Sequence, residues 1–387
     1  MMVVKCLAYL VALLLLLLNY GANGHRVSRK VLDYEKQFKL LQKTSVTTIK
    51  NEYGDIYDCV DFYKQPAFDH PLLANHTFHP EMKPSSFALK EERTISKERE
   101  ILSNNMKSRG KGCPTGTIPI KRMSKDDFIK MKRFTEDYTS RTRSNDFENH
   151  FAVLQTTPNP SKKIYHGAKG IFTYHDPKVS DSQYTLGGLT IMNGDDTIKA
   201  GWMINPAVNK DNRTRLFQYF NGGSSHCFNM LCSGFVNVNK EAPIDDVLEP
   251  MSKRWGKIYG IKLSIFKDPK DGNWWLVIGT ENTIQGFWPG KIFNGLANSA
   301  TFVSFGGEAY GPVDQPLPPI GSGYKGIASP DDAAYVLGVT VLDENLKEDY
   351  NPVETETYTD DPQYTVTDYG WSNRYGRIMF YGGTTPV

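Results

Sequence analysis

The second half of the chain consists of short apolar runs that alternate with polar residues and are separated by turn residues. Residues 261–265 (IKLSI) show the alternation clearly, and similar runs occur at residues 151–156, 274–279, 301–305, 336–342 and 378–381. Alternation with a period of two is typical of β-strands with one buried face. No helical repeats lie between the runs. We therefore expect residues 142–387 to form an all-β domain, an antiparallel β-sandwich of two packed, jelly-roll-like sheets.

The composition excludes several other classes of protein. Aromatic residues make up 12% of the chain, and 33 glycines and 22 prolines interrupt it, which argues against a helix bundle. A hydrophobic content of 39% excludes wholesale disorder. Lys and Arg (45) nearly balance Asp and Glu (43), so the net charge is +2 and we expect no nucleic-acid partner.

An apolar run near the start of the chain predicts export. Residues 6–18 (CLAYLVALLLLLL) follow Lys5 and precede Ala22-Asn23-Gly24, which has small residues where a signal peptidase cleaves. The run is shorter than the roughly 20 residues that cross a bilayer. We therefore expect residues 1–24 to be a cleaved signal peptide and the mature chain to be secreted, with no membrane partner.

Cysteines and sequons fit an exported chain. Removal of the signal peptide leaves Cys59, Cys113, Cys227 and Cys232. An even number in an oxidising compartment predicts two disulfides, for which three connectivities exist. Proximity in the sequence favours Cys59 with Cys113 and Cys227 with Cys232. Sequons at Asn75 and Asn212 are candidate glycosylation sites.

Residues 25–141 have an irregular, mixed pattern and are expected to form a separate α/β segment. Residues 87–106 have a helical composition, and residues 113–120 indicate an extended stretch between turns. Residues 132–145 (KRFTEDYTSRTRSN) are mostly polar and are expected to be an exposed linker. That linker is the best place for a domain boundary and for proteolytic cleavage.

No motif predicts a metal or a cofactor. His76 and His79 have the spacing of metal ligands, but no carboxylate falls in register with them. Residues 321–326 (GSGYKG) match the glycine pattern of dinucleotide-binding loops, yet they follow a proline-rich loop and open no helix.

One carboxylate is a candidate acid–base group. On the expected strand over residues 301–309, alternation places Phe302, Ser304, Gly306 and Glu308 on one face. Glu308 ends an apolar run and follows two glycines that leave room for a substrate, which suits general acid–base chemistry. The alternative is a solvated glutamate at a strand end.

Several multi-residue blocks follow one another along the chain in a recognisable order. In the first segment they are residues 58–61 (DCVD), 65–73 (QPAFDHPLL) and 113–120 (CPTGTIPI). In the second half they are residues 199–206 (KAGWMINP), 211–217 (DNRTRLF), 227–236 (CFNMLCSGFV), 272–276 (GNWWL), 286–289 (GFWP), 306–308 (GGE) and 321–323 (GSG). From about residue 55 almost to the C-terminus, the chain resembles the neprosin family of plant secreted proteins.

The resemblance implies a glutamic endopeptidase that cleaves after proline at acid pH and is made as a zymogen. Residues 25–141 would be its activation peptide and residues 142–387 its catalytic domain, without a cofactor. The implied partner is a proline-containing peptide or protein, in the cell wall or apoplast, with the vacuole as the alternative. In the family, two glutamates across the concave sheet activate a water molecule. Two neighbouring carboxylates do not both ionise easily, so one keeps a proton and serves as the acid.

The resemblance places one of these glutamates at Glu308 and the other at the position that Lys199 occupies here. On the expected strand over residues 198–204, Lys199 shares a face with Gly201 and Met203 and should point into the cleft. An ammonium beside Glu308 would keep that carboxylate ionised and unable to donate a proton. Two hypotheses stay open: an acid peptidase that tolerates Lys199, and a catalytically inactive module that binds proline-rich or cell-wall polymers.

Four tryptophans are candidate stacking surfaces in a substrate groove, where they would contact proline rings or sugars. They are Trp202, Trp274, Trp275 and Trp288. Packing in the core is the alternative use of these side chains.

Overall fold

The computed structural model describes residues 32–85, 102–103, 112–140, 147–157, 163–223, 225–279, 281–327, 329–352 and 354–385. The expected signal peptide and most of the expected helix over residues 87–106 lie outside these ranges. Leu102–Ser103 is described and forms a short strand, β3, instead of a helix. Within the described ranges, no helix has the length and apolar character that crossing a membrane would require.

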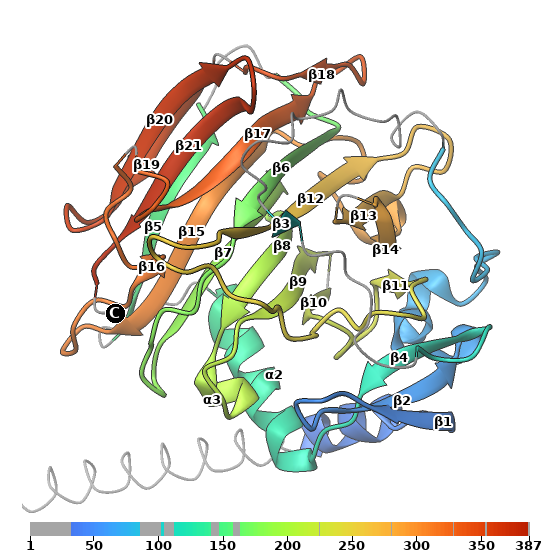
Figure 1. Cartoon of the computed structure of the whole chain (residues 1–387). Coiled ribbons are helices and arrows are strands. Elements are labelled where there is room, and N and C mark those ends of the chain that lie inside the picture. Colours follow the sequence, from blue (N-terminus) through green and yellow to red (C-terminus); the bar gives the residue numbers. More distant parts are fainter. Residues whose placement is uncertain are drawn as a thin grey trace, which may run out of the picture.

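Two large sheets form the part of the chain after residue 147 (Figure 1). In the first sheet, seven strands are ordered β10-β9-β8-β7-β15-β5-β19, and every neighbouring pair is antiparallel. In chain order its strands are β5 (Phe147–Thr156), β7 (Tyr184–Asn193), β8 (Asp196–Ile204), β9 (Arg215–Gly222), β10 (Ser225–Phe228), β15 (Phe302–Pro312) and β19 (Thr355–Thr359).

The second sheet has eleven strands, with the main order β11-β14-β13-β12-β6-β17-β21-β16. Strands β18 and β20 pair with β17 and β21, and β3 pairs with β12 in the one parallel pairing among the described strands. The other strands are β6 (Gly167–Thr173), β11 (Val236–Asn237), β12 (Tyr259–Lys267), β13 (Trp274–Ile278), β14 (Thr283–Trp288), β16 (Ile320–Gly321), β17 (Ala334–Leu342), β18 (Glu348–Asp349), β20 (Thr365–Ser372) and β21 (Gly376–Gly383).

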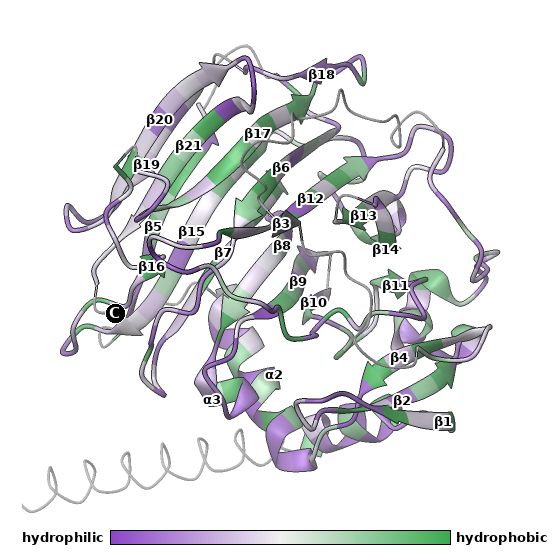
Figure 2. Ribbon diagram, in the orientation of Figure 1, coloured by the Kyte–Doolittle hydropathy of each residue, from purple (hydrophilic) through white to green (hydrophobic). Residues whose placement is uncertain are grey.

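The two sheets pack face to face around one hydrophobic core. The rings of Phe172 on β6 and Phe305 on β15 stack across the core with their centroids 6.3 Å apart. Nε1 of Trp202 on β8 donates a hydrogen bond across the same space to the carbonyl of Thr173 on β6, at 3.0 Å. Apolar residues lie along the strands of both sheets, whereas the connecting loops are mostly hydrophilic (Figure 2). The expected all-β sandwich is confirmed.

The described residues between 32 and 140 form a smaller unit, which we call the N-terminal module. It contains a helix over residues 32–41, a three-stranded antiparallel sheet ordered β1-β2-β4, and the long helix α2 (Lys125–Ser140). The strands are β1 (Ser45–Lys50), β2 (Ile56–Asp61) and β4 (Thr117–Lys121). The module lies at one end of the sandwich, with α2 beside β9 and β10 and close to the short helix α3 (Pro206–Asn209) (Figure 1).

The prediction of an exposed linker over residues 132–145 is wrong for residues 132–140, because α2 continues to Ser140. Its inner side repeats at helical spacing through Phe128, Met131, Thr135 and Tyr138, and the first three of these are at least 95% buried. The polar composition of the segment hid this pattern, because threonine and tyrosine take positions that an apolar residue usually fills.

Both expected disulfides are present. Cys59 pairs with Cys113 inside the N-terminal module, and Cys227 pairs with Cys232 inside the sandwich. Asn75 and Asn212 are exposed, and glycosylation at these two residues stays a prediction.

Candidate active site

The middle of the seven-stranded sheet brings Lys199 and Glu308 together. Lys199 lies on β8 and Glu308 on β15, and both strands pair with β7 between them. Three glycines in register, Gly201, Gly188 and Gly306, cross these strands between the two charged residues. Because glycine has no side chain, this row places no side chain between the two charged residues, and the lysine can reach the carboxylate. Nζ of Lys199 lies 2.5 Å from Oε2 of Glu308.

Glu308 is buried and accepts hydrogen bonds at both carboxylate oxygens. Only 5% of the residue is exposed. Oε2 accepts from the Lys199 ammonium and from the hydroxyl of Tyr138 at 3.3 Å, while Oε1 accepts from the hydroxyl of Tyr184 at 2.8 Å. The carboxylate thus accepts hydrogen bonds from three donors, one of which is a cation.

The hydroxyl of Tyr184 is a hydrogen-bond donor to Glu308. It begins β7, and burial together with the neighbouring Glu308 carboxylate raises the pKa of its phenol far above the usual value of 10.0. The hydroxyl therefore keeps its proton at every physiological pH. Its second neighbour is Oδ1 of Asn149 on β5, at 3.0 Å.

Helix α2 covers the two charged residues. Nζ of Lys199 donates to the hydroxyl of Tyr138 at 2.6 Å, and Tyr138 in turn contacts Glu308. The hydroxyls of Thr139 and Tyr219 are 2.9 Å apart, and the ring of Phe134 packs on Tyr184 with centroids 5.4 Å apart. The last two turns of α2 therefore rest on the site through hydrogen bonds and aromatic contacts.

A cleft of about 740 Å³ surrounds the pair. Its walls come from β5, β7, β8, β15 and α2, and β15 contributes Phe302, Ser304, Gly306 and Glu308 on one face, as alternation predicts. Aromatic side chains also line it, namely Phe134, Tyr138, Phe147, Phe151, Tyr184, Tyr219, Phe302, Tyr310 and Tyr358. Lys199 and Glu308 lie in its wall.

The prediction that four tryptophans line the groove is wrong. Trp202, Trp274, Trp275 and Trp288 are fully buried, and none of them lines the cleft. Their indole nitrogens bond inside the protein, as Nε1 of Trp288 does with Oε1 of Gln218 at 3.2 Å. Every residue of β13 is buried, because one face meets the sandwich core and Trp275 packs on Phe287 at 4.6 Å. The cleft uses phenylalanine and tyrosine instead.

Tyr138 and Tyr184 contact Glu308 but were not identified from the sequence. Tyr184 could have been found, because it shares the face of Leu186, Gly188 and Thr190 by simple alternation along β7. Tyr138 could not, because nothing in a polar helix indicates which strand it will cover. No group of three His, Cys, Asp or Glu side chains in the described part of the chain is arranged to hold a metal ion.

Two protein-family models match the chain. Residues 48–162 match the model for the neprosin activation peptide, and residues 176–384 match the model for neprosin. Among solved structures, the chain is similar to scytalido-glutamic peptidase crystallised with a peptide-based transition-state analog. The identity is 6% and the TM-score 0.33, over 62% of this chain and 98% of that chain. It is also similar to a β-porphyranase of the human gut bacterium Bacteroides plebeius, at 7% identity and a TM-score of 0.19, over 62% and 77% of the two chains.

Proposed function

Because this chain belongs to the neprosin family, we propose that it is a secreted, glutamic-peptidase-like zymogen whose cleft binds proline-containing peptides without cleaving them efficiently. The observation that carries the proposal is the 2.5 Å contact between Lys199 and Glu308. The family's type protein uses two glutamates, and here an ammonium takes the place of one.

Peptide hydrolysis needs a base for the attacking water and an acid for the departing nitrogen. Two carboxylates that share one proton supply both functions. In this cleft, Glu308 accepts hydrogen bonds from Lys199, Tyr138 and Tyr184. Among the described residues, the one ion pair of Glu308 is with the Lys199 cation. The proposed cleft therefore lacks the second carboxylate that the acid-pH mechanism requires.

The lining of the cleft supports peptide binding. Phe151 and Phe302 are partly exposed, and Tyr358 is 43% exposed, so each offers a ring face to a ligand. Aromatic faces pack well on the flat, apolar ring of proline. Sugars of cell-wall polymers also stack on such faces, and they are the alternative ligand that the experiment must separate.

A slow peptidase is the second candidate function. Glu308 remains in the wall of the cleft as a potential base, and the Lys199 ammonium beside it could stabilise a developing oxyanion. Such a pair needs an ionised carboxylate, so its activity would rise from acid toward neutral pH. The dyad of two carboxylates has the opposite dependence on pH.

The test uses the full chain with Phe134→Ala and Tyr138→Ala, which remove the two α2 rings that cover the site. A fluorescent proline-containing peptide, the same peptide with alanine for proline, and a cell-wall oligosaccharide are titrated against it, and cleavage is followed from pH 3 to pH 8. We expect selective binding of the proline peptide without cleavage, and acid-pH cleavage after Lys199→Glu. Cleavage by Lys199-bearing protein that Glu308→Gln abolishes would replace binding by the second candidate function. Preference for the oligosaccharide, or no binding at all, would refute peptide binding.

A further inference from the structure

We propose that the N-terminal module stays bound to the sandwich as a non-covalent subunit after the connection at residues 141–146 is cut. This inference concerns the association of two parts of the chain and does not depend on what the cleft binds or cleaves. It follows from four sets of contacts that join the module to the sandwich.

The first is a shared hydrophobic core. Phe62, Leu73 and Ile118 of the module are at most 1% exposed, and they belong to the same continuous cluster as the core of the sandwich. Across the boundary, Phe78 meets Phe287 of β14 edge to face at 4.9 Å. Two independent units would each have a core of their own, whereas here separation would expose apolar side chains on both parts.

The second is the fully buried side chain of Gln65. Its Oε1 accepts from the backbone nitrogen of Asn237 on β11 at 2.9 Å, and its Nε2 donates to the backbone carbonyl of the same residue at 3.3 Å. The amide thus takes the place of a neighbouring strand at the edge of the large sheet. Nearby, the backbone nitrogen of Cys113 donates to the carbonyl of Lys240 at 2.8 Å.

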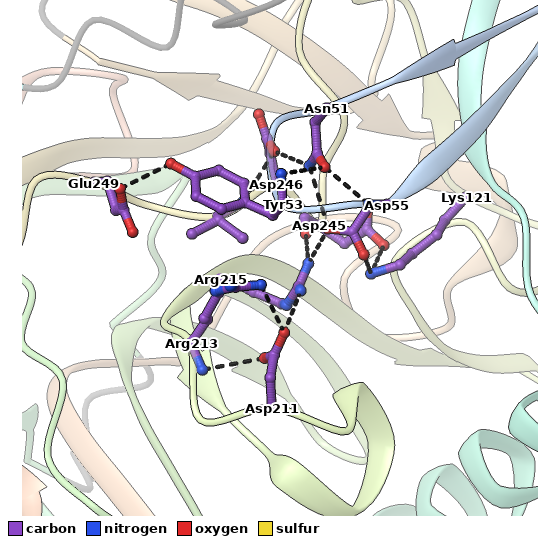
Figure 3. A network of polar contacts seen from close by, with 11 residues as sticks. Asn51, Tyr53, Asp55, Lys121, Asp211, Arg213, Arg215, Asp245, Asp246 and Glu249 are labelled. Carbon is purple, nitrogen blue, oxygen red and sulfur yellow. Dashed lines mark hydrogen bonds and ion pairs between the residues drawn. The ribbon is translucent and has the colours of Figure 1, made fainter.

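The third is a polar network at the tip of the β1–β2 hairpin (Figure 3). Asp55 forms a 2.7 Å ion pair with Arg215 of β9, which is almost fully buried. Tyr53 donates to Glu249 at 2.9 Å, and Asn51 donates to Asp246 at 3.3 Å. In Figure 3 Tyr53 points to Glu249 while Asp55 lies near Arg215 and Lys121, so the tip is fixed at several points.

This network withstands mild acid. Burial alone would raise the pKa of Asp55, but the charges of Arg215 and Lys121 outweigh it and lower the pKa to about 2. The stabilisation is complete above the ordinary value of 3.8 and is lost only as the pH falls through about 2. The other charged or titratable groups around the tip are Tyr57, Asp211, Arg213, Asp245, Asp246 and Glu249.

The fourth is α2 itself. Asp127 forms a 2.8 Å ion pair with Lys210, which follows α3, and the other end of the helix holds Tyr138 over the cleft. Since the cut at residues 141–146 lies beyond the helix, it breaks none of these contacts. Neither disulfide joins the module to the sandwich, so after the cut only non-covalent contacts remain.

The experiment replaces residues 141–146 by the recognition sequence of a specific protease and cuts the folded, full-length protein. We expect the two fragments to elute as one complex of the uncut mass at pH 7.5. The same sample should give two bands on a denaturing gel without reductant, which shows that the cut is complete. Separation of the fragments on the native column at pH 7.5 would overturn the proposal.

A matched pair of variants tests the contacts themselves. Gln65→Ala leaves both backbone groups of Asn237 unpaired, and we expect it to weaken the association of the fragments roughly tenfold or more. Gln37→Ala removes the same kind of side chain from a partly exposed site on the helix over residues 32–41, and it should change the association less than about twofold. If Gln65→Ala prevents folding of the uncut chain, the cut wild-type protein still decides the proposal. Equal effects of the two variants would contradict it.

Discussion

Lys199→Glu would turn the buried ion pair of the cleft into two facing carboxylates, and its effect can be measured without any catalysis. In the wild-type protein the two side chains are 11% and 7% exposed and lie 2.5 Å apart. Both are therefore well removed from solvent, so their interaction is only weakly screened. The substitution removes the attraction and adds repulsion, while Tyr138 and Tyr184 remain as donors to Glu308.

The magnitude follows from the burial of the pair. Removal of one partner of a buried pair costs about 3–5 kcal/mol, because the remaining charge has no compensation. Two facing carboxylates lower this cost by keeping one proton between them, which raises the pKa of the pair above the value of about 4.3 for free glutamate. A carboxyl group whose pKa is higher in the folded state than in the unfolded state stabilises the fold at pH values below the unfolded-state pKa. This stabilisation is lost as the pH rises through the folded-state pKa. The loss of stability relative to the wild type should thus be small at pH 4 and reach about 3–5 kcal/mol at pH 7.

The assay is urea unfolding of the wild type and the variant at pH 4, 5.5 and 7, followed by tryptophan fluorescence. Lys178→Glu is the matched control, since Lys178 is 68% exposed and its nearest carboxylate oxygen lies 3.6 Å away. The control should change the free energy of unfolding by less than about 1 kcal/mol at each pH. If Lys199→Glu had no cost at pH 7, or the same cost at pH 4 and pH 7, the assigned ion pair would be wrong.

Three further outcomes can be checked. Cys113→Ser should reduce the free energy of unfolding by about 4 kcal/mol and Cys227→Ser by about 2 kcal/mol, because the disulfides close separations of 54 and 5 residues. Denaturant titration of each variant and the wild type measures these two losses. Association of the cut fragments should weaken progressively below about pH 6.5. The reason is that burial and the charge of Lys291 lower the pKa values of His70 and His76. The Nδ1 atoms of both histidines also accept backbone hydrogen bonds. His70→Gln with His76→Gln should flatten that profile on a native column, and an unchanged profile would exclude the histidines. Tyr138→Phe should speed hydrogen exchange in the last turns of α2 about fivefold, since one hydrogen bond contributes about 1 kcal/mol, whereas exchange in β13 should not change.

The parts of the site that follow from local rules were predictable from the sequence. Alternation along a strand has a fixed period of two, so Lys199 and Glu308 could each be assigned to a face without knowledge of the fold. The disulfides were predictable for a similar reason, since the cysteines of each pair lie in the same segment. The distance between Lys199 and Glu308 was not predictable, because it depends on how β8 and β15 are aligned with β7.

Burial on both faces of a strand explains why the tryptophans were misassigned. An isolated sequence indicates that a strand is apolar, but it does not indicate how many layers cover the strand. In β13, the residues WWLVI are all buried. The N-terminal module contacts the neighbouring strand β14, where Phe78 packs on Phe287. The prediction of an exposed linker was wrong because helix α2 of the same module occupies part of that segment. Helix α2 is polar enough to appear exposed, yet its inner side packs on aromatic rings and forms hydrogen bonds with polar groups of the cleft.

Under the proposed function, the ammonium group of Lys199 takes the place of a second carboxylate and also helps to hold α2 over the cleft. It donates to Glu308 and to Tyr138, and the hydroxyl of Tyr138 donates a hydrogen bond to Glu308, so the three groups form a closed ring of donors and acceptors. A glutamate in place of Lys199 would leave the single proton of Tyr138 between two carboxylates. A second acid in this cleft would therefore favour hydrolysis and weaken the contact that holds α2 in place. Lysine has the reverse effect on both, so the contact that holds α2 and the proposed lack of efficient cleavage would have one cause.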